Sequence, residues 1–73
     1  MDNLEILDKV GSNIRKIRLK SGLSQESVAM LSEMNRSSFA AIDRGGVNLT
    51  ILTMVKIARA LDIKISEILE GVV

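Results

Sequence analysis

The sequence predicts an all-α fold, a compact bundle of five helices in a single domain that spans residues 1–73. Apolar residues recur at spacings of three and four along most of the chain, which is the period of an amphipathic helix. Capping residues precede these stretches, and glycines follow several of them. No segment alternates like a half-buried strand, proline is absent and Phe39 is the only aromatic residue, so a sheet is disfavoured.

The first helix is expected from about Asn3 to Lys20. Its apolar positions share one stripe, which consists of Leu7, Val10, Ile14 and Ile17. Gly22 follows directly and ends the helix, because glycine adopts the left-handed conformation favoured just past a helix end without strain.

Two short helices are predicted in the middle of the chain. Ser24 is a suitable N-cap for a helix of about two turns that ends near residues 32–33. Its buried residues are expected to be Val28, Ala29 and Leu31. Asn35 caps the next helix, residues 36–43, whose apolar positions are Phe39 and Ile42.

Two further helices are predicted in the last third of the chain. Gly45 and Gly46 end the preceding helix, and Thr50 caps a fourth one. The apolar stripe of this fourth helix is expected to comprise Ile51, Met54, Val55, Ala58 and Leu61. Ser66 is expected to cap a final short turn, residues 67–70.

The composition disfavours several classes of protein. A chain of 73 residues has a small core, and without cysteine or histidine it has neither a disulfide nor a plausible structural zinc site to support that core. No catalytic constellation and no Gly-rich phosphate loop occurs, so we expect neither an enzyme nor a cofactor. The acidic N-terminal segment does not resemble a secretory signal, and no apolar run is long enough to span a bilayer. A cytoplasmic protein without a membrane partner is therefore expected.

The charge is segregated along the chain, although the formal net charge is only +1. Nine of the ten Lys and Arg residues lie between Lys9 and Arg59, whereas six of the nine acidic residues lie outside that range. A basic middle segment is typical of a nucleic-acid-binding surface. Ordinary solvated helix faces would give the same pattern, so charge alone leaves both interpretations open.

Residues 22–45 resemble the helix-turn-helix of the lambda-repressor-like (Xre/Cro) family, with the sequence GLSQESVAMLSEMNRSSFAAIDRG. The wider frame, from IRKIRLKSGLSQ to LTMVKIARALDIKISEIL, is similar to that family as well. Ala29, four residues after Gln25, stands where two steeply crossing helices leave space only for a small side chain. The resemblance implies that the second and third helices form the motif.

The same resemblance implies that the helix of about residues 36–43 lies in the major groove of DNA. Arg36 and Ser37 would then contact base edges, and the guanidinium of Arg36 suits O6 and N7 of guanine. Ser38 would contact either a base or a phosphate.

Other residues resemble the family's phosphate contacts and its ion pair. Gln25, in the first turn of the second helix, would hold a phosphate, and Arg44 and Asn48 would add further phosphate contacts. A local hydrogen bond within the turn is an alternative role for Asn48. Arg18 and Asp43 resemble a partly buried ion pair whose role is structural.

Two positions depart from the common family pattern. Glu33 stands where many relatives have a turn glycine, so it must adopt a left-handed conformation or reshape the turn. Leu49 stands where relatives often carry proline. In two features the chain resembles the controller proteins of restriction–modification systems, namely the run Asn48-Leu49-Thr50 and a length of 73 residues.

Apolar residues are dense in the last eleven residues, and a dimerisation surface is expected near residues 61–73. Its expected members are Ile63, Ile65, Ile68 and Leu69. In the family, a two-fold interface at this end places two recognition helices about one DNA turn apart, roughly 34 Å, on a near-palindromic operator. The alternative is that this end only caps the core of the monomer.

The predicted function is transcriptional regulation, by activation or repression, through a homodimer that binds a double-stranded DNA operator. RNA polymerase is a candidate further partner. The alternative is a protein-interaction module with the same fold, such as an antitoxin or an anti-repressor. Ala40 and Ala41 make the third helix nearly neutral and so permit that alternative, whereas Gln25, Arg36 and Arg44 match DNA-binding roles.

Overall fold

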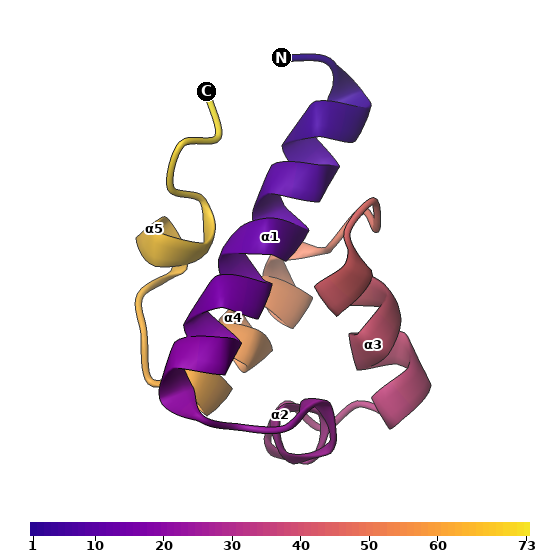
Figure 1. Cartoon of the computed structure of the whole chain (residues 1–73), viewed down its shortest axis with the longest axis vertical. Helices are drawn as coiled ribbons and strands as arrows, with labels where there is room; N and C mark the ends of the chain where they lie inside the picture. The colour runs from indigo at the N-terminus through magenta and orange to yellow at the C-terminus, as the bar shows by residue number, and fades with distance from the viewer.

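The computed structural model describes all of residues 1–73, and these form five helices and no strand (Figure 1). The helices are α1 (Asn3–Ser21), α2 (Gln25–Leu31), α3 (Arg36–Arg44), α4 (Ile51–Leu61) and α5 (Ile65–Ile68). In Figure 1 the long α1 separates α5 from α3, α4 lies behind it, and α2 lies near its C-terminal end. The predicted all-α bundle of five helices is confirmed. None of these helices combines the length and the apolar character that a membrane span needs.

Polar side chains cap the starts of the first four helices. The side-chain oxygens of Ser24, Asn35 and Thr50 accept the backbone N–H three residues further on, at 3.0, 2.8 and 3.1 Å. Asp2 caps α1 in the same way at 2.8 Å. Each bond satisfies one of the backbone donors that a helix start leaves free. The three caps predicted for the second, third and fourth helices are confirmed.

The fifth helix begins earlier than predicted. Ser66 lies inside α5 rather than at its cap, and the helix ends at Ile68. Lys64 is the N-cap residue, and its backbone N–H donates to the carboxylate of Glu67 at 2.9 Å. Ile65 and Ile68 are three residues apart, and both pack inward. Burial of these two side chains therefore decides the position of the last helix, in place of the serine hydroxyl.

All five helices contribute to one hydrophobic core. Its eleven buried apolar residues are Val10, Ile14, Val28, Ala29, Phe39, Ile42, Met54, Ile57, Ala58, Leu61 and Ile68. Phe39, the one aromatic residue, is fully buried among them. The core holds the helices in the positions from which the exposed face of α3 is presented.

The inward faces of α2 and α4 differ from the predicted ones. Leu31 is 54% exposed, because Ser32, one turn after Val28, occupies the inward position. Ile51 is 67% exposed at the start of α4, whereas Ile57, absent from the predicted stripe, is fully buried. In α2 the inward position lies one residue later than predicted, whereas in α4 Met54, Ala58 and Leu61 are buried as predicted and the first position is wrong. Spacing alone does not resolve such differences in short helices.

The backbones of α1 and α3 meet at Gly11. A Cβ atom at this position would lie 2.7 Å from Cα of Gly45 and 2.8 Å from the carbonyl oxygen of Ile42. Real Cβ atoms essentially never approach other heavy atoms so closely. Gly11 therefore lets α1 pack directly against the C-terminal end of α3.

Candidate nucleic-acid interface

A tight turn joins α2 to α3. The backbone N–H of Met34 donates to the carbonyl of Ala29 at 2.9 Å, and that of Glu33 donates to Met30 at 3.1 Å. Glu33 has a φ of 57°, which is the left-handed conformation. Of the two outcomes expected for Glu33 in place of a turn glycine, the structure shows this one. Ala29 is buried where α2 and α3 pack together.

The face of α3 that points away from the core is polar at its N-terminal end. Arg36, Ser37 and Ser38 are all exposed, while Phe39 lies on the inner side. The Ser37 hydroxyl donates to the side-chain oxygen of Asn35 at 3.0 Å. This contact orients Ser37 and leaves the lone pairs of its hydroxyl oxygen able to accept a further hydrogen bond.

A shallow groove of about 580 Å³ lies between the start of α2 and the outer face of α3. Its lining residues are Gln25, Arg36, Ser37, Ala40 and Arg44. Two guanidinium groups and one amide thus surround a space with no acidic lining residue. Such a set of donors suits an anion such as a phosphate of a nucleic-acid backbone.

Two of the predicted DNA-binding residues lie outside this groove. Ser38 is exposed on α3, and its backbone N–H is engaged by the Asn35 cap. Asn48 lies in the loop before α4 and lines a separate small hollow with Asn3, Ile6 and Leu7. The structure therefore brings four predicted residues together, Gln25, Arg36, Ser37 and Arg44, and leaves Asn48 apart from them.

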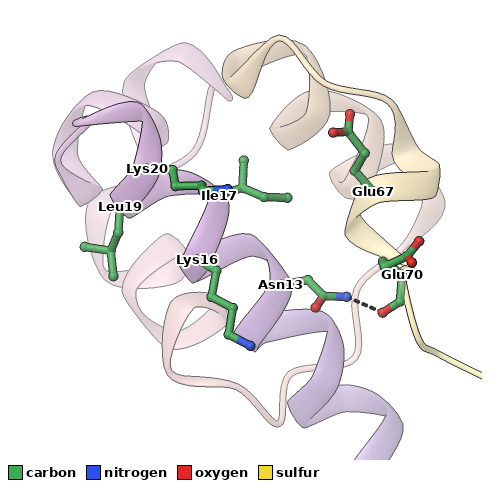
Figure 2. Close-up of a pocket in the computed structure, with 7 residues that line it drawn as sticks. All are labelled: Asn13, Lys16, Ile17, Leu19, Lys20, Glu67 and Glu70. Atoms are coloured by element: carbon green, nitrogen blue, oxygen red, sulfur yellow. Dashed lines mark hydrogen bonds between the residues drawn. The ribbon is translucent and has the colours of Figure 1, made fainter.

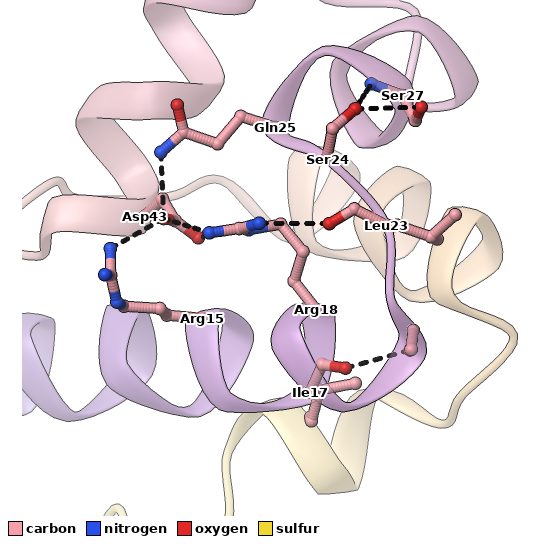
Figure 3. A network of polar contacts seen from close by, with 9 residues as sticks. Arg15, Ile17, Arg18, Leu23, Ser24, Gln25, Ser27 and Asp43 are labelled. Atoms are coloured by element: carbon pink, nitrogen blue, oxygen red, sulfur yellow. Dashed lines mark hydrogen bonds and ion pairs between the residues drawn. The ribbon is translucent and has the colours of Figure 1, made fainter.

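Asp43 is the centre of a polar network that joins α1, α2 and α3 (Figure 3). Its Oδ1 accepts from Nε of Arg18 at 3.0 Å, and its Oδ2 accepts from Nη2 of the same arginine at 3.1 Å. Nη1 of Arg18 donates to the carbonyl of Leu23 at 3.0 Å. Both charged side chains are buried, so the contact is bidentate and shielded from water.

Two further side chains complete this network, and neither contact with Asp43 was predicted from the sequence. Arg15 donates to Oδ2 at 3.1 Å, and Gln25 donates to the same oxygen through Nε2 at 3.0 Å. Arg15 lies three residues before Arg18 on the same face of α1, a spacing that indicates a shared partner. Gln25 has two N–H groups, so one remains for a ligand in the groove.

The network lowers the pKa of Asp43. Burial of the carboxylate acts in the opposite direction and would raise the pKa. Hydrogen bonds from Arg18 and Gln25, together with the positive charges of Arg18 and Arg15, outweigh burial and hold the pKa below its ordinary value. Asp43 is therefore ionised at neutral pH and accepts the four bonds from Arg15, Arg18 and Gln25.

The residues predicted for dimerisation differ in their accessibility. Ile68 is fully buried in the core of its own chain, so it is not available to a second copy, which corrects that assignment. Ile63 and Ile65 are half-buried and pack against the core, while Leu69 is 37% exposed. Ile51 and Leu52, at the start of α4, are more exposed than any of these, and the sequence analysis did not assign them to a surface.

Known proteins share both the sequence pattern and the fold. The chain matches the family described as Helix-turn-helix over residues 14–68. It is 30% identical over 73 residues to the control protein C.MunI of Mycoplasma sp, with 99% of this chain and 96% of that protein covered. It is also 33% identical over 70 residues to the control protein C.BamHI of Bacillus amyloliquefaciens, with 94% of this chain and 84% of that protein covered.

A solved structure gives the same result. The crystal structure of the restriction–modification controller protein C.AhdI from Aeromonas hydrophila superposes with a TM-score of 0.81 at 40% identity. The superposition covers 85% of this chain and 94% of that one. The polar groove between α2 and α3 therefore lies on the motif that defines these proteins, and the chain belongs to the helix-turn-helix family of DNA-binding transcriptional regulators.

Proposed function

We propose that this chain controls the genes of a restriction–modification system by binding an operator as a homodimer, with α3 in the major groove. One observation carries the proposal. The groove between α2 and α3 collects Gln25, Arg36 and Arg44, and no acidic side chain lines it. The controller proteins among its relatives support restriction–modification genes as the target.

In this proposal the outer face of α3 reads the bases. Arg36 lies at the first position of the helix, exposed, where its planar guanidinium can donate two parallel hydrogen bonds to guanine. Ser37 accepts from a neighbouring base, and Ser38 contacts a base or a phosphate. The side chain of Ala40 is small, so it allows α3 to approach DNA closely.

Backbone contacts hold the same helix in register. Gln25 donates its remaining N–H to a phosphate at the N-terminal end of α2, where the helix dipole favours a negative group. Arg44 holds a second phosphate at the other end of α3. Asn48, which lies apart from the groove, reaches a phosphate further along the strand.

A second copy completes the operator-binding unit. Exposed apolar side chains at the start of α4 and in the C-terminal turn support this step, namely Ile51, Leu52 and Leu69. Ile63, after α4, and Ile65, at the start of α5, are half-buried and add partly accessible apolar side chains. The buried Ile68 packs in the core instead, which is the capping role that the sequence left open as the alternative for this segment. Two copies related by a two-fold axis would require a near-palindromic operator, and RNA polymerase bound next to it would be the further partner.

Selection from a random DNA pool tests this function. We expect the protein to enrich one near-palindromic sequence, and to lose affinity for it as salt rises, with a log–log slope of about −0.9 for each neutralised phosphate. Duplexes from the region upstream of neighbouring endonuclease and methyltransferase genes should carry the selected sequence. Failure to enrich any sequence would contradict DNA recognition and would instead favour a protein-interaction module.

A further inference from the structure

Asn13 connects α1 to the C-terminal turn through two hydrogen bonds. Its side-chain Nδ2 donates to the carbonyl oxygen of Ile68 and to that of Glu70, each at 2.8 Å. Asn13 is buried, and Figure 2 shows it on the wall of the groove between α1 and the C-terminal segment, with its bond to Glu70. An amide nitrogen carries two hydrogens, so these two bonds use its whole donor capacity.

The two carbonyls that Asn13 holds lie on either side of Leu69. Leu69 is the most exposed of the residues predicted for the dimerisation surface, at 37%. Its own backbone N–H donates to Ile65, and its carbonyl accepts from Val72 at 3.0 Å. Hydrogen bonds therefore hold the main chain on both sides of Leu69. Asn13 is the only side chain that donates to this segment.

The same helix also touches the DNA-reading element. Gly11, two residues before Asn13, meets the backbone at the C-terminal end of α3, at Ile42 and the cap residue Gly45, while Asn13 meets the C-terminal turn. Two residues on a helix are about 200° apart around its axis, so these contacts lie on nearly opposite sides of α1. Figure 1 shows this arrangement, with α3 on one side of α1 and α5 on the other. A single rigid helix therefore links the recognition helix to the turn that presents Leu69.

We propose that Asn13 is a positioning residue that sets the spacing and angle between the two recognition helices of the homodimer. This inference rests on the proposed homodimer, whose surface includes Leu69. Asn13 fixes the C-terminal turn on α1, and α1 carries α3 through Gly11. In a two-fold dimer the same tilt of the turn occurs in both copies, so the two displacements add to the change in separation between the recognition helices.

Half-site spacing is the readout that separates this role from a contribution to folding. One base pair displaces a half-site by about 3.4 Å along DNA and rotates it by about 35°, since one turn contains 10–10.5 pairs. A rigidly held dimer should discriminate against such a change, whereas a dimer with a loosened turn should tolerate it. The selected half-site is placed twice on a duplex at its preferred spacing, and on duplexes one base pair longer and shorter.

We expect the unmodified protein to bind the preferred spacing about tenfold more tightly than either altered spacing. Asn13→Ala should reduce this preference to about threefold or less and weaken self-association in sedimentation equilibrium, because the ordering of the turn must then be achieved on binding. Binding to a duplex with a single half-site should not change. Asn13→Ala should still fold, because the released carbonyl of Glu70 is only partly buried, so water can bond to it, and the eleven apolar core residues are unchanged.

Two further variants make the test specific. Ser12→Ala, at the position just before Asn13 on α1, removes a hydroxyl that bonds to neither element and should behave like the unmodified protein. Asn13→Gln retains the amide but moves it by one methylene, and it should also blur or shift the preferred spacing. Circular dichroism reports whether each variant keeps its helices.

Unchanged spacing preference and self-association in Asn13→Ala would overturn the inference. Loss of the helical signal in both Asn13 variants would also overturn it, because the contact would then support folding rather than the interface. An unmodified protein that forms no dimer, or that binds all spacings equally, would instead contradict the proposed function itself. Measurements on the unmodified protein therefore test the proposed function, and measurements on the variants test the role of Asn13 independently.

Discussion

Arg36 and Arg44 lie in the same groove at opposite ends of α3. We propose that Arg36 contacts bases and that Arg44 contacts a phosphate. Arg36 stands at the N-terminal end, where a recognition helix enters the major groove, whereas Arg44 stands at the C-terminal end. Gln25 differs from both, because one of its N–H groups is already held by Asp43. Its replacement would disturb the polar network as well as the groove, so Arg44 is the cleaner probe of a phosphate contact.

Arg36→Ala should therefore lose preference for the selected operator over a scrambled duplex by about 1–3 kcal/mol, the discrimination that a bidentate arginine–guanine contact provides. Arg44→Ala should weaken both duplexes by similar factors and reduce the salt slope by about one. Fluorescence anisotropy at several salt concentrations measures both effects. Arg59→Ala is the matched control, since Arg59 is an exposed arginine on α4 outside the groove. An equal loss on both duplexes in Arg36→Ala would contradict its role in base reading.

At the scale of elements, α1 organises the molecule because it contacts α3, α4 and α5. Its two most constrained positions are Gly11, against the backbone of α3, and Asn13, against the C-terminal turn. Neither residue belongs to an apolar stripe, so a search for helical periodicity does not find them. Their constraint comes from what they meet, namely backbone atoms of segments more than 25 residues away in the sequence.

Gly11→Ala should destabilise the protein by about 1–3 kcal/mol, because the new methyl group would force the backbones of α1 and α3 apart. In an unconstrained helix the same substitution would stabilise by about 0.5–1 kcal/mol, so the sign of the change is diagnostic. Urea denaturation measures the free energy of unfolding, with Ser12→Ala as the control on the same helix. A Gly11→Ala variant more stable than the unmodified protein would show that α1 and α3 are not in close contact.

At the scale of the whole molecule, Asp43 ties three helices together through Arg15, Arg18 and Gln25. Because its pKa is lowered in the folded protein, folding favours the ionised form. The resulting stability is present above the pKa of the unfolded chain, and it is lost as pH falls through the lower pKa of the folded state. Acid should therefore release the network that holds α3 against α1 and α2.

The Asp43→Asn variant tests this link. At pH 7 it should be less stable than the unmodified protein by about 3 kcal/mol, since Arg18 would be buried without a charged partner. The difference should shrink as pH falls below about 4, because protonation then neutralises Asp43 in the unmodified protein as well. Urea denaturation between pH 7 and pH 2 gives both curves, and Glu26→Gln, at an exposed acid of α2, is the control. A difference that stays constant over this range would argue against the role of the Asp43 charge.

Much of this arrangement could be predicted from local sequence. The five helices and the caps at Ser24, Asn35 and Thr50 depend on residues within a few positions of one another. The groove residues of α3 follow in the same way, because the helical period separates them from the buried Phe39. Such features were accessible because hydrogen bonds and side-chain spacing within one helix determine them.

The sequence by itself therefore determined the five helices, the caps of α2, α3 and α4, and which residues of α3 face away from the core. Only the tertiary structure decided which residues are buried in α2 and α4, as Ser32 and Ile57 show. It also decided that Ile68 packs in the core, that Gln25 bonds to Asp43, and that Asn13 holds a carbonyl 55 residues away. The physical reason is that these contacts depend on how the helices pack in space, and the period of a single helix carries no information about its neighbours.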